Sequence, residues 1–134
     1  MTDPVPSFEH STKRILVVDD DRSVRDMLVR VLVEDGYKAT SAADGNEAVE
    51  MAAEESFDLA LLDVGLPGKN GWETFINLTR ETPSLAVLII TARSNQQSIA
   101  THLAADALFE KPLDFPLLLR TVRELLDKTV PKLS

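Results

Sequence analysis

Acidic side chains follow two of the apolar segments of this sequence. Three consecutive aspartates (19–21) come directly after the apolar run 15–18, and Asp63 follows the run 59–62. Neighbouring carboxylates raise one another's pKa unless a cation compensates their charge. Mg²⁺ is such a cation, because it binds through one or two carboxylates and also takes phosphate oxygens. A carboxylate beside it can attack phosphorus and form an acyl phosphate, so these residues point to phosphoryl transfer onto an aspartate.

A hydroxyl and an ammonium group follow two further apolar runs. Thr91 comes after the run 85–90 and precedes Ala92, and Lys111 comes shortly after the run 107–109. A transferring phosphoryl group spreads its charge over three oxygens, which a metal ion, an ammonium group, a hydroxyl and backbone N–H groups can hold. These residue types therefore suit the binding of a phosphoryl group beside its acceptor.

The charges of the candidate side chains decide which ion fits. Asp19, Asp20 and Asp63 sum to −3, and Lys111 contributes +1. A divalent cation supplies the remaining +2 and brings the site to neutrality. We therefore expect Mg²⁺, or Mn²⁺ in its place, as the cofactor.

The apolar runs are continuous rather than alternating, which is typical of strands buried on both faces of a parallel sheet. Such runs lie at residues 15–18, 59–62 and 85–90. The segment 38–42 is more polar, as an edge strand would be, and the short run 107–109 suits the opposite edge.

Between these strands, apolar residues recur with helical spacing. Asp21, Asp44 and Asp114 are the expected N-caps of three helices, and Gly36 is the expected terminator of the first. The expected buried faces are Val24, Met27, Leu28, Val31 and Leu32; Trp72, Phe75, Ile76 and Thr79; Ile99 and Leu103 in a helix over 95–104; and Leu118, Val122 and Leu125.

Strand and helix therefore alternate five times along the sequence. This order predicts an α/β fold: a doubly wound five-stranded parallel sheet in the flavodoxin-like order 2-1-3-4-5, with five helices on two faces. Ligands bind such sheets beyond the carboxyl ends of the strands, where the candidate side chains stand. We expect residues 13–128 to form this domain, 1–12 a flexible N-terminal tail and 129–134 a short C-terminal tail.

Composition narrows the class of protein. The chain has 134 residues, which suits one domain, and no cysteine, which excludes disulfide scaffolds, thiol enzymes and Cys-based zinc sites. Its net charge of −8 argues against direct contact with nucleic acid or with an anionic membrane. The sequence contains neither a signal peptide nor an apolar run of roughly 20 residues, so we expect a soluble, cytoplasmic protein.

Four stretches, taken together in this order, resemble the receiver domain of response regulators in two-component signalling. They are Ile-Leu-Val-Val-Asp-Asp-Asp (15–21), Leu-Leu-Asp-Val-Gly-Leu-Pro-Gly-Lys-Asn-Gly (61–71), Leu-Ile-Ile-Thr-Ala (88–92) and Glu-Lys-Pro-Leu (110–113). The resemblance implies a phosphoprotein that acts as a switch in a phosphorelay rather than as an enzyme on other substrates. It also implies that a histidine kinase or a phosphotransfer protein donates the phosphoryl group.

The resemblance assigns the metal ligands and the acceptor. Asp63 is the phosphoacceptor and contributes to the metal site, and Asp20 binds the metal ion directly. Asp19 acts mainly through water, and Gly65 contributes its backbone carbonyl. Asp21 lies in the same run, but we interpret it as the helix cap rather than as a ligand.

The resemblance also assigns the phosphate ligands and an output surface. Thr91 and the N–H of Ala92 bind the phosphoryl oxygens, Lys111 pairs with the phosphate, and the Lys111–Pro112 peptide bond is expected to be cis. A downstream protein is expected to bind the face of the fourth helix, fifth strand and fifth helix. The chain would be a stand-alone receiver, or one excised from a longer protein, without an output domain of its own.

Three positions depart from the family's pattern. The switch residue three before the lysine is usually Tyr or Phe, whose ring turns inward as the nearby hydroxyl residue moves; here it is Leu108. Phe109 should not replace it, because neighbouring strand residues point to opposite faces. We therefore expect Thr91 still to move while readout by an aromatic ring is weakened or replaced. Gly65 and Arg93 stand where the family's side chains line the path of hydrolytic water.

Three other functions remain as alternatives. A phosphatase of the haloacid-dehalogenase type also uses an aspartate nucleophile with Mg²⁺, but it needs a second acid where this chain has Gly65. A flavodoxin-type FMN protein would need hydroxyls and N–H groups after the first strand rather than carboxylates. The third alternative is an adaptor that has the receiver fold and is never phosphorylated.

Overall fold

Strands and helices alternate along the chain in the computed structural model, which describes residues 12–65, 71–93 and 95–127. In chain order they are β1 (Arg14–Val18), α2 (Arg22–Glu34), β2 (Lys38–Ala42), α3 (Gly45–Glu54), β3 (Leu59–Asp63), α4 (Gly71–Glu81), β4 (Ala86–Thr91), α5 (Gln97–His102), β5 (Ala107–Glu110) and α6 (Phe115–Asp127). Of the two expected tails, only Thr12 lies within the described residues. Within those residues, every helix is too short or too polar to cross a membrane.

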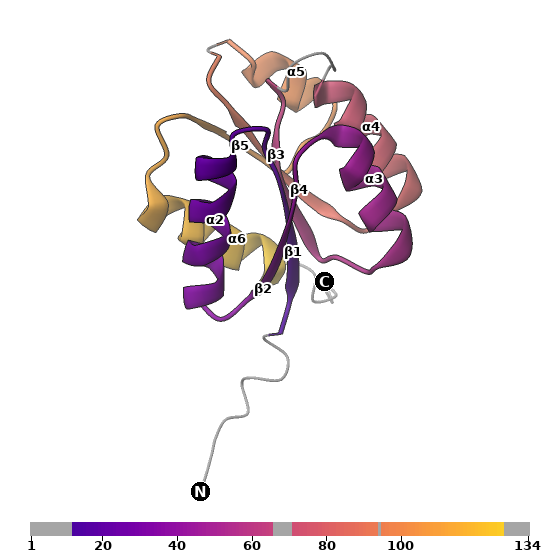
Figure 1. The fold of residues 1–134 in the computed structure, drawn as a ribbon. Coiled ribbons are helices and arrows are strands. Elements are labelled where there is room, and N and C mark those ends of the chain that lie inside the picture. The colour runs from indigo at the N-terminus through magenta and orange to yellow at the C-terminus, as the bar shows by residue number, and fades with distance from the viewer. Residues whose placement is uncertain (1–11, 66–70, 94, 128–134) are drawn as a thin grey trace, which may run out of the picture.

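The strands form one parallel sheet in the order β2-β1-β3-β4-β5, as predicted (Figure 1). The polar strand β2 and the short strand β5 are its edges. From β1 the chain winds to one side to form β2 and then crosses to the other side to form β3, so the winding direction reverses between β1 and β3. The carboxyl ends of these two strands are therefore the expected place for a ligand.

Helices cover both faces of the sheet (Figure 1). Successive residues of a strand point to opposite faces, so they pack against different helix layers. Leu16 and Val18 of β1 pack into one apolar cluster with residues of α3, α4 and α5. Ile15 and Val17 pack into the other cluster with residues of α2 and α6. Because each central strand is buried on both sides, its sequence must be a continuous apolar run, as observed.

The helix caps follow the sequence prediction. Asp21 is the N-cap of α2, and its carboxylate accepts hydrogen bonds from two backbone N–H groups of the first turn at 2.9 and 3.3 Å. Asp44 and Asp114 likewise accept from N–H groups of the helices that follow them. Gly36 follows α2 with φ of 101°, a left-handed conformation that ends helices and that side chains disfavour.

Three residues that the spacing places on buried helix faces are in fact exposed. Met27, Ile76 and Ile99 have exposed fractions of 51%, 42% and 39%. The helix expected over 95–104 is also shorter, and Ala100 rather than Ile99 is its buried residue. The physical reason is that a helix lying on a sheet buries only a narrow stripe, so apolar residues at the margin of that stripe face solvent.

Candidate functional site

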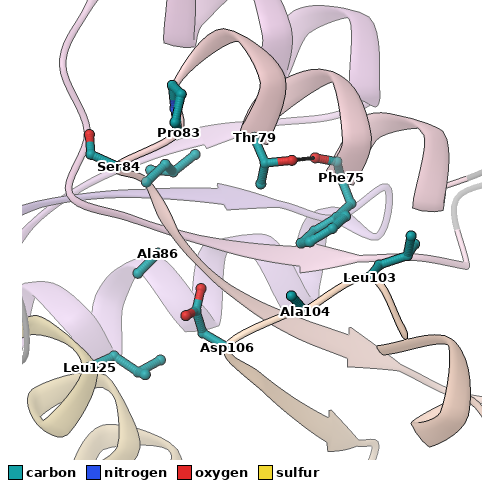
Figure 2. A pocket seen from close by; sticks show the side chains of 10 residues that line it. Phe75, Thr79, Pro83, Ser84, Ala86, Leu103, Ala104, Asp106 and Leu125 are labelled. Carbon is teal, nitrogen blue, oxygen red and sulfur yellow. Dashed lines mark hydrogen bonds between the residues drawn. The ribbon is translucent and has the colours of Figure 1, made fainter. Parts of the chain in front are cut away.

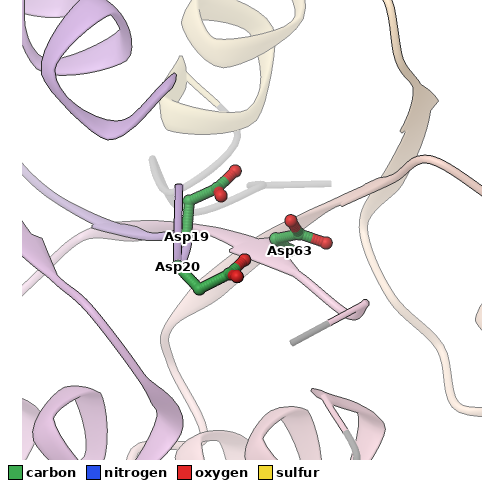
Figure 3. Close-up of side chains that lie close together, drawn as sticks. All are labelled: Asp19, Asp20 and Asp63. Atoms are coloured by element: carbon green, nitrogen blue, oxygen red, sulfur yellow. The ribbon is translucent and has the colours of Figure 1, made fainter. Parts of the chain in front are cut away.

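Three aspartates converge at the carboxyl edge of the sheet (Figure 3). Asp19 follows β1 and Asp63 ends β3, and the parallel pairing of these neighbouring strands brings their ends to the same level. Asp19 and Asp63 are buried, with exposed fractions of 1% and 5%, whereas Asp20 is exposed. Each contributes one carboxylate oxygen to a group whose members all lie within 4.8 Å of one another.

Lys111 supplies the positive charge at this edge. Its Nζ donates hydrogen bonds to Oδ2 of Asp63 at 3.0 Å and to Oδ2 of Asp19 at 3.1 Å. Burial by itself would lower the pKa of Lys111, but its hydrogen bonds to the two carboxylates and their negative charges outweigh burial and raise the pKa. Lys111 therefore remains charged at neutral pH and links the tips of β1 and β3.

One ammonium group does not neutralise the acids. Burial raises the pKa of Asp19, and the negative charge of Asp63 raises it further, against the lowering effects of the Asp21 N–H and of Lys111. This direction means that the surroundings of Asp19 disfavour its charged form. A divalent cation among the three carboxylates would reverse that balance, and their oxygen donors are those that Mg²⁺ prefers. The residues present therefore fit a magnesium site.

Thr91 ends β4 and is fully buried beside this group. Its Oγ1 accepts a hydrogen bond from the N–H of Arg93 at 2.9 Å, and its carbonyl accepts one from the N–H of Lys111 at 2.8 Å. The next residue, Ala92, is exposed at the same edge. The peptide bond between Lys111 and Pro112 is cis, as expected.

Two glycines lie close to the end of β3. The N–H of Gly65 donates to Oδ1 of Asp63 at 2.8 Å, so one carboxylate oxygen is held by the backbone and the other by Lys111. Gly71 begins α4, and a Cβ at this position would lie 2.2 Å from the Cα of Val64. Only glycine allows the helix to start this close to the end of β3.

Two contacts around the site were not predicted from the sequence. The Nη1 of Arg25, in the first turn of α2, donates to the backbone carbonyl of Asp19 at 2.9 Å. The Nε1 of Trp72 donates to Oε1 of Gln96 at 3.1 Å and so joins the start of α4 to the loop before α5. No periodic signal in the sequence identifies the partner of Arg25 or of Trp72.

A cavity of about 490 Å³ lies at the amino ends of the strands, away from their carboxyl ends (Figure 2). Phe75 of α4 and Leu103, directly after α5, line it, and Ala86, which begins β4, lies on its wall. Asp106 also lines it, and its carboxylate accepts a hydrogen bond from a backbone N–H of β4 at 2.8 Å. The aspartate group lies at the opposite, carboxyl ends of the strands, so the cavity is separate from it.

Comparison with known proteins identifies the family. The model of the response regulator receiver domain matches residues 15–123. The response regulator MprA of Mycolicibacterium vanbaalenii is 39% identical over 120 residues, and MprA of Mycobacterium leprae is 40% identical over 120 residues. Each match covers 88% of this chain but only 52% and 53% of the relatives, so the chain spans about half of their length.

Solved structures agree with this assignment. The response regulator TrrA from Thermotoga maritima, in complex with Mg²⁺–BeF, is 34% identical with a TM-score of 0.78, and the match covers 84% of this chain and 98% of TrrA. A CheY-like receiver domain protein from Methanospirillum hungatei is 33% identical with a TM-score of 0.84, covering 89% and 97%. With this fold and these matches, the chain belongs to the response regulator receiver domain family of two-component signalling.

Proposed function

We propose that the protein is a phosphoacceptor switch, in which Asp63 receives a phosphoryl group from a phosphohistidine of a histidine kinase or a phosphotransfer protein. The observation that carries this proposal is the position of Asp63: it is buried at the tip of a central strand, among two further carboxylates and Lys111. Residues 13–128 are proposed to form the receiver unit.

The chemical step is a transfer between nitrogen and oxygen. A carboxylate oxygen of Asp63 attacks phosphorus, the bond between phosphorus and the imidazole nitrogen breaks, and the imidazole leaves with its electron pair. Gly65 and Lys111 orient the carboxylate of Asp63 before attack through their hydrogen bonds to its two oxygens. Mg²⁺, held by Asp19, Asp20, Asp63 and the carbonyl of Gly65, would supply charge neutralisation to the phosphoryl oxygens.

The remaining site residues hold the transferred group. Lys111 stands 3.0 Å from the acceptor carboxylate and is placed to pair with a phosphoryl oxygen. The hydroxyl of Thr91 can donate to a second oxygen while it still accepts from the N–H of Arg93. The N–H of Ala92 is a further donor at the same edge.

The signal would then pass to a downstream protein through the face formed by α5, β5 and α6. Its two helices carry exposed apolar side chains, Ile99 in α5 and Leu117 in α6, with exposed fractions of 39% and 41%. Phosphorylation would shift an existing equilibrium between two forms toward the one that the partner binds.

The test is the intact mass of the protein after incubation with acetyl phosphate. The wild type should gain one phosphoryl group in the presence of Mg²⁺ and none in excess EDTA, and Asp63→Asn should gain none under either condition. A wild type that stays unmodified with Mg²⁺ would overturn the proposal and favour an adaptor that has the receiver fold but no phosphoryl chemistry.

A further inference from the structure

Arg25 contacts the backbone of the aspartate run without touching its carboxylates. It lies in the first turn of α2, where its own N–H donates to the carbonyl of Asp21 at 2.9 Å. Its half-buried guanidinium reaches back along the chain, and Nη1 donates to the carbonyl of Asp19 at 2.9 Å. Arg25 therefore ties the start of α2 to the end of β1 across the residues that carry the acids.

The carbonyl of Asp19 belongs to the peptide group that joins Asp19 to Asp20. On the Asp19 side the chain is already held, because its N–H donates to the carbonyl of Ala42 at 3.3 Å and its Oδ1 accepts from the N–H of Asp21 at 2.9 Å. The carboxylate of Asp20 is exposed, so packing does little to hold it, and the orientation of the plane of this peptide group contributes to its direction. The hydrogen bond from Arg25 fixes that plane.

We propose that Arg25 is a positioning residue of the metal site: its guanidinium holds the Asp19–Asp20 peptide group so that these carboxylates converge with Asp63. The inference rests on the proposed function, because the ion concerned is the Mg²⁺ that the three acids would bind. It is a role exerted through Asp19 and Asp20, since the hydrogen bond of Arg25 goes to a backbone carbonyl and not to a carboxylate.

Two effects of removing Arg25 have opposite signs, which makes the proposal testable. Loss of one positive charge near three carboxylates strengthens their attraction for Mg²⁺. Loss of the hydrogen bond to the carbonyl loosens the ligands and weakens binding, and removal of groups that orient metal ligands typically costs about 10–100-fold in affinity. A positioning role predicts net weakening, whereas a purely electrostatic role predicts tighter binding.

Arg22 offers a matched control on the same helix. Its side chain is 84% exposed and pairs only weakly, at 3.6 Å, with Asp26 one turn further on. Arg22→Gln therefore removes the same charge as Arg25→Gln without affecting the carbonyl of Asp19. Arg25→Lys keeps the charge but replaces the planar donor group by a shorter ammonium.

The experiment is isothermal titration calorimetry of MgCl₂ into each folded variant, with folding checked by circular dichroism. We expect the Mg²⁺ dissociation constant of Arg25→Gln to rise by about 10-fold relative to Arg22→Gln, with Arg25→Lys in between. If Arg25→Gln does not fold, the comparison of Arg25→Lys with the wild type decides, because these two proteins carry the same charge and differ only in the donor group.

Dissociation constants equal to that of Arg22→Gln, or lower, would overturn the inference, as would a loss of stability with unchanged affinity. Failure of the proposed function would look different, because the wild type itself would then show no heat of Mg²⁺ binding and no mass gain.

Discussion

Leu108 and Phe109 are neighbours on β5, and their side chains pack on opposite faces of the sheet. Leu108 contacts the cluster shared with α3, α4 and α5, and Phe109 contacts the cluster shared with α2 and α6. Leu108 pairs with Ile89 of β4, and Thr91 lies two residues further on and so on the same face. The expectation that these two side chains point to opposite faces is confirmed, and that Phe109 does not replace an aromatic at position 108 in switching stays a prediction.

Phe109 should therefore keep its face when the protein is activated. Structures determined with and without Mg²⁺ and beryllofluoride should show displacement of the Thr91 hydroxyl toward the acceptor and an unchanged Phe109 rotamer, because turning the ring would empty its place among packed residues. A Phe109 ring found on the Leu108 side in the activated form would contradict this prediction.

Trp72 should report on the switch by its fluorescence. It is the single tryptophan of the chain, and its Nε1 donates to Gln96 in the loop that follows Thr91. Movement of that loop changes the hydrogen bond and hence the emission of the indole. We expect Mg²⁺ with beryllofluoride to change the emission of the wild type and to have a smaller effect on Gln96→Ala.

Gln97→Ala is the matched control for that experiment, because Gln97 is exposed and its amide donates to Thr101 within α5. It should respond as the wild type does. An equal response from all three proteins would show that the Trp72–Gln96 hydrogen bond does not report the movement.

Replacement of Lys111 by Met should destabilise the metal-free protein. Lys111 contacts two buried carboxylates, Asp19 and Asp63, and its removal leaves them without a counter-charge. Because Lys111 is 24% exposed, we expect a loss of about 1–3 kcal/mol in the free energy of unfolding, below the range for fully buried pairs. Urea unfolding in EDTA measures this loss, and added Mg²⁺ should restore part of it.

Arg123→Met provides the comparison for Lys111→Met. Arg123 pairs with Asp35 at 3.4 Å, but its side chain is 61% exposed. Its removal should cost less than about 0.5 kcal/mol, with or without Mg²⁺. A Lys111→Met variant as stable as Arg123→Met would show that repulsion between the carboxylates of Asp19 and Asp63 does not destabilise the fold.

Asp19→Asn should have the opposite effect on the metal-free protein. The raised pKa of Asp19 means that the folded state binds a proton more tightly than the unfolded chain, whose value is near 3.8. The free energy of unfolding therefore falls as the pH rises from 3.8 through the pKa that Asp19 has in the folded state, because its carboxyl loses its proton over this range. At neutral pH the carboxyl is charged, and the destabilisation is complete. Removing the charge should raise the melting temperature in EDTA at pH 7 by about 2–4 °C.

The pH series separates this effect from a general change in packing. The difference in stability between Asp19→Asn and the wild type should shrink as the pH falls toward 3.8, because the wild-type carboxyl then becomes neutral. Added Mg²⁺ should stabilise the wild type more than the variant. A difference that is independent of pH would contradict the assignment to the charge of Asp19.

The sequence alone determined the strand order of the sheet, its two outer strands and the set of side chains at the carboxyl ends of its strands. Continuous apolar runs are required where strands are buried on both faces, and the carboxyl ends of parallel strands share one edge. Asp63 at the end of one run and Lys111 after another were therefore predictable as neighbours. The helix caps at Asp21 and Asp114 were predictable for the same kind of reason, since they depend on local backbone N–H groups.

Only the tertiary structure decided which apolar helix residues are buried and which distant polar groups meet. Met27 fits the helical stripe but is 51% exposed, because the width of the buried stripe depends on how the helix lies on the sheet. The contacts of Arg25 with the Asp19 carbonyl and of Trp72 with Gln96 have no periodic signal. They depend on the direction of single side chains across a loop, which packing sets and residue spacing does not encode.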